Sequence, residues 1–131
     1  FFGEGPGEPY TIVRKDERKR VSRFASKNGV KYGYSYESLG FDKKDRHMEP
    51  FLVTLEPTTL KSTKTSPNEG EEFIFVLEGE VEARLGGEVV LLKQGDSLYF
   101  ESEVPHSFVG RGHSRPRALA VLSVGAEYRG A

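Results

Sequence analysis

The stretch SPNEGEEFIFVLEGE, residues 66–80, holds the side chains with the clearest chemical potential in this sequence. Its acidic residues Glu69, Glu71 and Glu72 stand directly before the apolar run 73–77. A carboxylate at the end of a buried strand could ligate a metal ion, hold a small molecule or simply satisfy a polar partner. Glu72 is therefore the first candidate functional residue, and all three roles remain open at this point.

We expect β-strands to position this carboxylate. In nearly every periodic segment of the chain the residue types alternate with a period of two, which is typical of strands. Gly86-Gly87 predicts a two-residue hairpin turn within residues 80–92. The chain has no convincing long helix, and residues 16–27 have room for two helical turns at most. Further strands are expected over 10–13, 30–39, 51–57, 72–79, 97–100, 106–109 and 118–124. This pattern predicts an all-β sandwich or barrel.

The predicted strand around Phe75 is apolar on both faces, because Phe73 and Leu77 share its side while Ile74 and Val76 lie on the other. Both faces must then be covered. One face can line the interior, and the other needs a second sheet, an N-terminal strand or another subunit. We therefore expect a homodimer, although an N-terminal segment could do the same work.

Composition narrows the function classes. The 131 residues suit one domain with a real core, and a net charge of −1 gives no overall attraction to nucleic acid or to an anionic membrane. No apolar run approaches the length of a bilayer span, and residues 1–20 lack the apolar stretch of a signal peptide. The absence of cysteine excludes disulfides and thiolate sites. We expect a cytoplasmic protein with no membrane partner.

The segment GEEFIFVLEGEVEARLGGEVVLLKQGDSLYFESEVPH, residues 70–106, resembles the core of the cupin superfamily. The resemblance implies a double-stranded β-helix, which is a jelly-roll-like barrel. Glu72 and Gly79 have the separation of the first cupin motif, and Gly95 and His106 match the second. A complete cupin metal site has three histidines and a glutamate, a set that suits Fe, Mn, Ni or Zn.

The resemblance breaks at the metal ligands, because the two histidine positions of the first motif fall on Ser66 and Asn68. We therefore expect no bound metal and no cofactor; if a metal binds, its ligands are Asn68, Glu72 and His106. The implied fold places Glu72 and His106 face to face at the barrel mouth, as a hydrogen-bonded pair or as the grip on a polar ligand. No nucleophile or oxyanion donor accompanies them, so we expect the chain not to be an enzyme.

Two phrases, GEEFIFVLEGEVEARLGGE and GDSLYFESEVPHSF, also resemble the sensor domains of bacterial helix-turn-helix transcriptional regulators. This resemblance implies a cupin that binds a small-molecule effector and reaches DNA only through a helix-turn-helix domain preceding Phe1. Residues 1–20, which open FFGEGPGEPY without methionine, would be a linker and an N-terminal strand, and residues 21–131 the effector-binding domain. The alternative is a cupin dioxygenase, isomerase or epimerase, with or without a metal.

Aromatic residues supply the lining that an effector site needs, because such sites combine apolar walls with a few convergent polar groups. Each tyrosine could instead be an ordinary strand residue that fills the core. Glu72 and His106 could likewise be a purely structural pair. None of these residues is assigned a catalytic role. The candidate ligand-binding residues are Tyr34, Tyr36, Asn68, Glu72, Tyr99 and His106.

Overall fold

The computed structural model describes residues 8–27, 30–55, 70–112 and 115–123. Within these ranges the chain forms β-strands and one short 3-10 turn, η1 (Lys15–Glu17). The strands are β1 (Arg20–Lys27), β2 (Val30–Ser38), β3 (Met48–Leu55), β4 (Glu71–Glu78), β5 (Glu80–Leu85), β6 (Glu88–Leu92), β7 (Ser97–Glu101), β8 (His106–Arg111) and β9 (Arg117–Ser123). The predicted all-β fold is confirmed.

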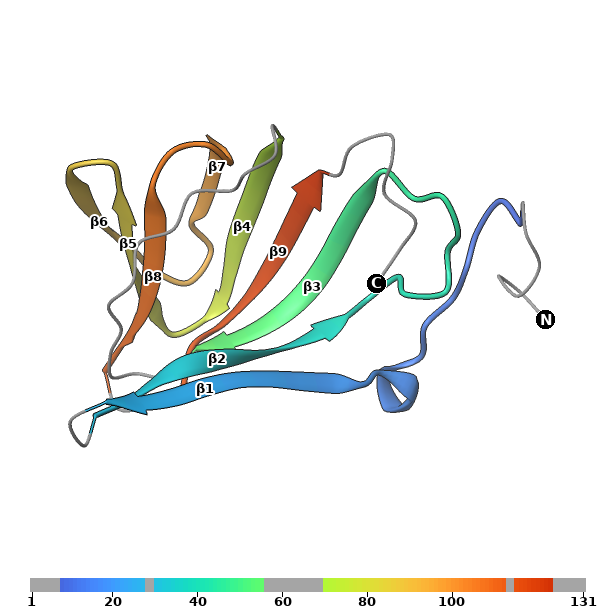
Figure 1. Ribbon diagram of the computed structural model, residues 1–131, viewed down its shortest axis with the longest axis horizontal. Coiled ribbons are helices and arrows are strands. Elements are labelled where there is room, and N and C mark those ends of the chain that lie inside the picture. Colours follow the sequence, from blue (N-terminus) through green and yellow to red (C-terminus); the bar gives the residue numbers. More distant parts are fainter. Residues whose placement is uncertain (1–7, 28–29, 56–69, 113–114, 124–131) are drawn as a thin grey trace.

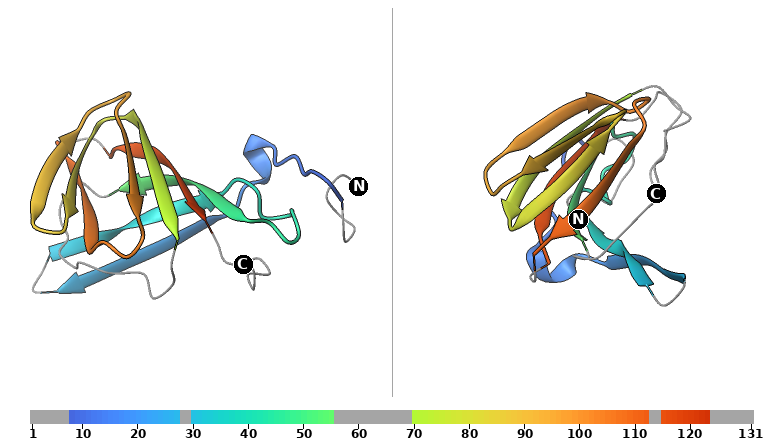
Figure 2. Two further views of the ribbon diagram at one scale, coloured as in Figure 1. Left: turned by 90° about the horizontal axis from the view of Figure 1, so that it is seen from above. Right: turned by 90° about the vertical axis from the view of Figure 1, so that its left-hand side faces the viewer.

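The strands form two antiparallel sheets. The larger has the order β1-β2-β3-β9-β4-β7, and the smaller has the order β6-β5-β8. Figure 1 shows the small sheet beside the curved large sheet, and the two views of Figure 2 show it lying over one face of that sheet. From β4 onward the chain moves back and forth between the sheets, which is the jelly-roll pattern that the cupin resemblance implies.

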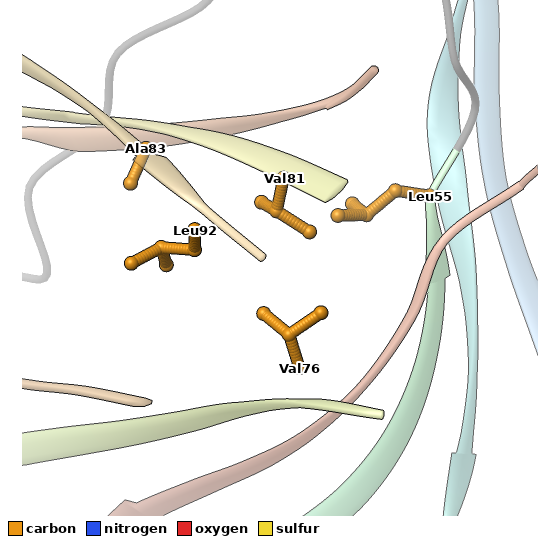
Figure 3. Close-up of a cluster of buried hydrophobic side chains, with 5 residues drawn as sticks. All are labelled: Leu55, Val76, Val81, Ala83 and Leu92. Carbon is orange, nitrogen blue, oxygen red and sulfur yellow. The ribbon is translucent and has the colours of Figure 1, made fainter. Parts of the chain in front are cut away.

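Side chains from both sheets form the core between the layers. Val76 of β4 points across the interior toward Val81 of β5 and Leu92 of β6, and Leu55 of β3 and Ala83 of β5 complete the cluster (Figure 3). Val76 and Val81 are fully buried. Because the cluster joins the two layers, its burial stabilises the pairing of the sheets rather than either sheet alone.

A second core cluster lies beside the first and contains Ile74, Phe100, Ala118 and Ala120. Ile74 and Val76 are therefore the interior residues of β4, while Phe73 and Leu77 lie on its outer face. Residues two apart on a strand share a face, so Glu72 points into the same interior as Ile74. The strand thus carries one carboxylate to the end of its buried face.

Two local predictions from the sequence were wrong. Residues 10–13 are irregular rather than a strand. Residues 20–27, which lie in the segment 16–27 where the sequence left room for two helical turns at most, form β1. This strand pairs with β2 along its whole length, from Arg20 opposite Glu37 to Lys27 opposite Val30. The charges of β1 are compatible with a strand because it lies at the sheet edge.

The domain bounds 1–20 and 21–131 stay a prediction, as does the homodimer. None of the helical structure within the described ranges has the length and apolar character needed to cross a bilayer.

Candidate functional site

Glu72 and His106 reach the interior from different sheets. Glu72 is the second residue of β4 and lies opposite Phe100 of β7 and Leu122 of β9. His106 is the first residue of β8 and lies opposite Leu85 of β5. Figure 1 shows that β4 and β8 stand on opposed layers, so the jelly-roll path brings together two residues that are far apart in the sequence.

The two side chains are close without forming a direct hydrogen bond. His106 Nε2 and Glu72 Oε2 are 3.8 Å apart, which is beyond hydrogen-bond range. The side chains are largely buried, at 15% exposure for His106 and 13% for Glu72. The two polar atoms are thus near neighbours in a largely buried position, and neither donates a hydrogen bond to the other.

The backbone and two aromatic rings hold the imidazole of His106 in place. His106 Nδ1 lies 2.7 Å from the carbonyl oxygen of Val104. The ring centroid of Phe100 is 4.9 Å from that of His106, and the ring of Phe108 is 6.0 Å away. These contacts leave the ring little rotational freedom, so Nε2 is presented toward Glu72 in a fixed direction.

The contact with Val104 also decides which nitrogen carries the proton. A carbonyl oxygen can only accept a hydrogen bond, so His106 Nδ1 must donate. In the neutral imidazole Nε2 is then an acceptor, and the ionised carboxylate of Glu72 accepts as well. Two acceptors facing one point suit a ligand group that donates hydrogen bonds to both.

Tyr99 does not belong to this site, because residues two apart on a strand share a face and it is Phe100 that faces inward. Tyr99 lies opposite Phe73 on the outer face of the large sheet and is 65% exposed. Its hydroxyl donates a hydrogen bond to Glu71 Oε1. That bond, together with the charge of the carboxylate, raises the pKa of Tyr99 above its usual value.

The structure separates Tyr36 from the Glu72–His106 pair. Tyr36 lies opposite Val53 and packs edge-to-face on Phe51, with 5.0 Å between ring centroids. Two strands, β3 and β9, stand between β2 and β4 in the sheet. Tyr36 thus packs against Phe51 of β3, and its predicted contact with a ligand stays a prediction.

The remaining two candidates are less fully placed. Tyr34 pairs through its backbone with Leu55, and its side chain lies outside the described part of the structure. Asn68 lies wholly outside the described residues. Their proposed contacts with a ligand stay predictions.

A metal ion at this point would take the Glu72 carboxylate and His106 Nε2 as ligands. No group of three His, Cys, Asp or Glu side chains comes together within the described ranges. Ser66 and Asn68, which stand at the histidine positions of the resemblance, lie outside those ranges. Because catalytic metal centres hold the ion with three protein ligands, the described donors alone do not fit a resident metal.

Three contributors to the site were missed from the sequence. Phe100 and Phe108 supply the aromatic wall, and the Val104 carbonyl orients the imidazole. The alternation of residues 97–100 could have identified Phe100, because Tyr99 and Phe100 are neighbours on one strand and only one can face inward. No sequence signal marks a backbone carbonyl as a hydrogen-bond partner.

Comparison with known proteins places the chain among proteins of more than one function. Residues 51–122, more than half of the chain, match the Cupin domain family. The (S)-2-hydroxypropylphosphonic acid epoxidase of Streptomyces wedmorensis is 32% identical over 116 residues, which cover 84% of this chain and 57% of the epoxidase. The HTH-type transcriptional regulator PuuR of Escherichia coli (strain K12) is 26% identical over 110 residues, covering 82% of this chain and 55% of PuuR.

A crystal structure of Fe(II) HppE has a TM-score of 0.65 to this chain at 27% identity, covering 91% of this chain and 62% of that one. The chain thus spans a little over half the length of the curated relatives it matches.

These relatives correct one expectation. The exclusion of enzyme activity was wrong, because an epoxidase is among the similar proteins and the Fe(II) form of HppE is among the similar structures. The expected resemblance to cupins of helix-turn-helix regulators is supported by PuuR. Because the family profile matches residues 51–122 and the strands form two antiparallel sheets in jelly-roll order, the chain belongs to the cupin domain family.

Proposed function

We propose that this chain is the small-molecule-binding cupin domain of a transcription regulator, and that its effector binds between Glu72 and His106. The 3.8 Å separation of Glu72 Oε2 and His106 Nε2, held by opposed sheets, is the observation that carries the proposal. Similarity to the regulator PuuR supports the regulatory role. DNA would be bound by a helix-turn-helix domain on the N-terminal side of this chain.

The site favours a ligand that donates hydrogen bonds. Glu72 accepts, and neutral His106 accepts at Nε2 because Nδ1 donates to Val104. A single amino group can donate to both acceptors, and two hydroxyl groups of one ligand can each donate to one of them. A carboxylate ligand would instead place its own acceptors against the Glu72 charge, which costs free energy in a largely buried site.

Such a ligand would connect the two sheets. Glu72 lies on the large sheet and His106 on the small one, so a bridging group adds bonds between the layers. An effector changes DNA affinity only by binding one arrangement of the protein better than another. Binding of this ligand would therefore change the distance between the site ends of β4 and β8.

A matched ligand panel tests the binding proposal. Amino, hydroxyl, ether and carboxylate compounds on a common carbon skeleton would be screened by ligand-observed NMR, and those that bind would be measured by calorimetry. Amino or hydroxyl compounds are expected to bind, and Glu72→Gln is expected to weaken them at least tenfold. The control Glu80→Gln removes an exposed carboxylate from β5 and should leave affinity unchanged. Equal affinity in wild type and Glu72→Gln would refute the site.

The regulatory part has a separate test. The open reading frame upstream of Phe1 is expected to encode a helix-turn-helix segment, and the complete protein should bind the DNA next to its own gene. Fluorescence anisotropy would then show whether the ligand changes that affinity. If a ligand binds but the affinity of the protein for DNA does not change, the proposed binding site is retained and the proposed regulatory role is refuted.

A cupin enzyme is the second candidate, favoured by the 32% identity to an epoxidase. In that case Glu72 and His106 would move protons on a bound substrate as base and acid. Incubation of each bound compound with the chain, with and without added Fe(II), followed by mass spectrometry, separates the two functions. A product that Glu72→Gln abolishes indicates an enzyme, and recovery of the unchanged compound indicates a receptor.

A further inference from the structure

Among the described residues, strand β6 is an apolar edge of the small sheet. It pairs with β5 on one side, and no described residue pairs with its other side. Val89, Val90 and Leu91 are 64%, 38% and 46% exposed on this strand. Figure 1 shows β6 at the outer end of the small sheet. Natural edge strands usually carry charges, proline or bulges that prevent pairing, and between Glu88 and Lys93 this strand has none of them.

The backbone of β6 is oriented for a second partner. The Gly86-Gly87 turn joins Leu85 to Glu88, and the turn's hydrogen bond makes these two residues a bonded pair. Bonded and non-bonded pairs alternate along an antiparallel ladder. Val89 and Leu91 therefore make no backbone hydrogen bonds to β5. Their N–H and C=O groups lie in the plane of the sheet and point outward, away from β5.

We propose that β6 is a self-association edge, through which two copies of this chain pair antiparallel with Val90 opposite Val90 of the second copy. The pairing joins the two small sheets into one continuous sheet across a twofold axis. This surface differs from the outer face of β4, from which the sequence suggested a second subunit, and it does not depend on which ligand the interior binds.

The register follows from the sequence of β6. A twofold axis normal to the sheet keeps the inner faces of both copies on one side, so opposite residues must share a face. Centring on Val90 places Val89 opposite Leu91 of the second copy, and the reverse. The outward-pointing backbone groups of Val89 and Leu91 then form two bonded residue pairs with Leu91 and Val89 of the second copy, and every exposed apolar residue of β6 meets another. Centring on Leu91 would instead place Val89 opposite the charged side chain of Lys93.

The association should be reversible. A contact of one short strand per copy lies below the ~1,200 Å² of stable complexes, so a dissociation constant above about 1 μM is expected. Dimerisation would then respond to protein concentration, and the dimer would form more fully when another domain holds two copies together.

Analytical ultracentrifugation of the 131-residue chain over a wide concentration range tests the surface. Leu91→Lys is expected to raise the dissociation constant at least tenfold. Leu77→Lys is the matched control, because Leu77 is 39% exposed but lies on β4, and it should leave the dissociation constant within about twofold. A chain that stays monomeric at every concentration, or a dimer unaffected by Leu91→Lys, overturns the proposal.

Cysteine cross-linking tests the register, and the natural sequence contains no cysteine to interfere. Opposite residues at a non-bonded position lie about 4.5 Å apart between Cα atoms, within disulfide range. Val90→Cys should therefore cross-link to a dimer under mild oxidation. In Val89→Cys the Cα atoms of the two cysteines would lie roughly 8 Å apart, because Val89 faces Leu91 of the second copy. This variant should therefore cross-link at least tenfold more slowly.

Leu77→Cys provides the background rate, because Leu77 and Val90 have nearly equal exposure, at 39% and 38%. Circular dichroism of each variant confirms that the chain is folded. If Val90→Cys reacts no faster than Leu77→Cys, the antiparallel register is wrong.

Discussion

The carbonyl oxygen of Val104 lies 2.7 Å from His106 Nδ1, and this contact fixes the chemical identity of the opposite nitrogen. Since the carbonyl accepts, Nδ1 carries the proton and Nε2 faces Glu72 with its lone pair when the ring is neutral. In metal sites the same arrangement, with one ring nitrogen bonded to a backbone carbonyl, fixes the tautomer and orientation of the imidazole. The site thus combines a fixed acceptor with a carboxylate.

The His106 tautomer can be measured directly. In alkaline buffer, where imidazoles are neutral, long-range ¹H–¹⁵N correlation spectra are expected to show His106 protonated at Nδ1 and unprotonated at Nε2. His47 is exposed and serves as the internal reference for a solvent-facing ring. A spectrum with the His106 proton on Nε2 would contradict the orientation and the ligand chemistry derived from it.

Tyr99 should ionise later than an ordinary tyrosine. Its bond to Glu71, and then the carboxylate charge, raise its pKa, so its titration midpoint should lie above that of an ordinary tyrosine. The linked stability is present below the usual pKa of tyrosine and is lost as pH rises through the raised pKa. The ultraviolet titration of wild type minus that of Tyr99→Phe isolates this residue. Glu71→Gln should lower the midpoint, and an unchanged midpoint would show that the contact is absent in solution.

Strand positions were predictable from the sequence because one face of each strand is buried, which imposes a period of two. Residues 80–85 illustrate this, because their apolar alternation and the Gly86-Gly87 turn predict β5 and its hairpin closely. The continuous apolar run 73–77 predicts β4 instead as a strand that is covered on both faces. The charged segment 20–27 gave no such signal, since an edge strand needs no apolar alternation, and β1 was missed.

The site was only partly predictable. Glu72 and His106 were identified because the cupin resemblance aligns them, and the structure brings them together. Tyr99 was misplaced because composition marks a residue as aromatic without saying which face it occupies; its position next to Phe100 decides that. The Val104 contact depends on the local path of the backbone before β8, which side-chain types do not encode.

Gly79 is expected to be the glycine least tolerant of substitution among those between β4 and β7. Its φ is +82°, and an added Cβ would lie 2.9 Å from both Cα and Cβ of Pro116. Gly95→Ala is a matched control, because its φ is +90° but no atom lies within 4 Å of the added Cβ.

Urea denaturation would separate the two costs in this pair. Gly95→Ala should lower the free energy of unfolding by about 1–2 kcal/mol through backbone strain alone. Gly79→Ala should lower it further, because the contact with Pro116 is added to the same strain. If both variants lose the same free energy of unfolding, the backbone around residue 79 moves away from Pro116 without a measurable free-energy cost.

Arg46 and Glu49 form a buried ion pair at the start of β3, with side-chain exposures of 6% and 4%. Arg46 also donates to the carbonyl oxygens of Phe41 and Lys43, so it holds the preceding loop against the strand. Glu49→Leu alone should reduce the free energy of unfolding by about 3–5 kcal/mol, because it leaves a buried charge without its carboxylate.

A double-mutant cycle checks this account of the pair. Arg46→Met combined with Glu49→Leu removes both charges, so its loss of stability should be clearly smaller than the sum of the single losses. Chemical denaturation of the four proteins gives the coupling energy. Additive losses would indicate that the two side chains act independently.

A crystal structure of the chain saturated with its tightest ligand decides whether an organic molecule lies between Glu72 and His106. A donor group of that ligand is expected within hydrogen-bond distance of both Glu72 Oε2 and His106 Nε2, with His106 Nδ1 still bonded to Val104. A transition metal ion ligated by Glu72 and His106 at full occupancy, or a ligand bound elsewhere while those two side chains close on each other, would contradict this expectation.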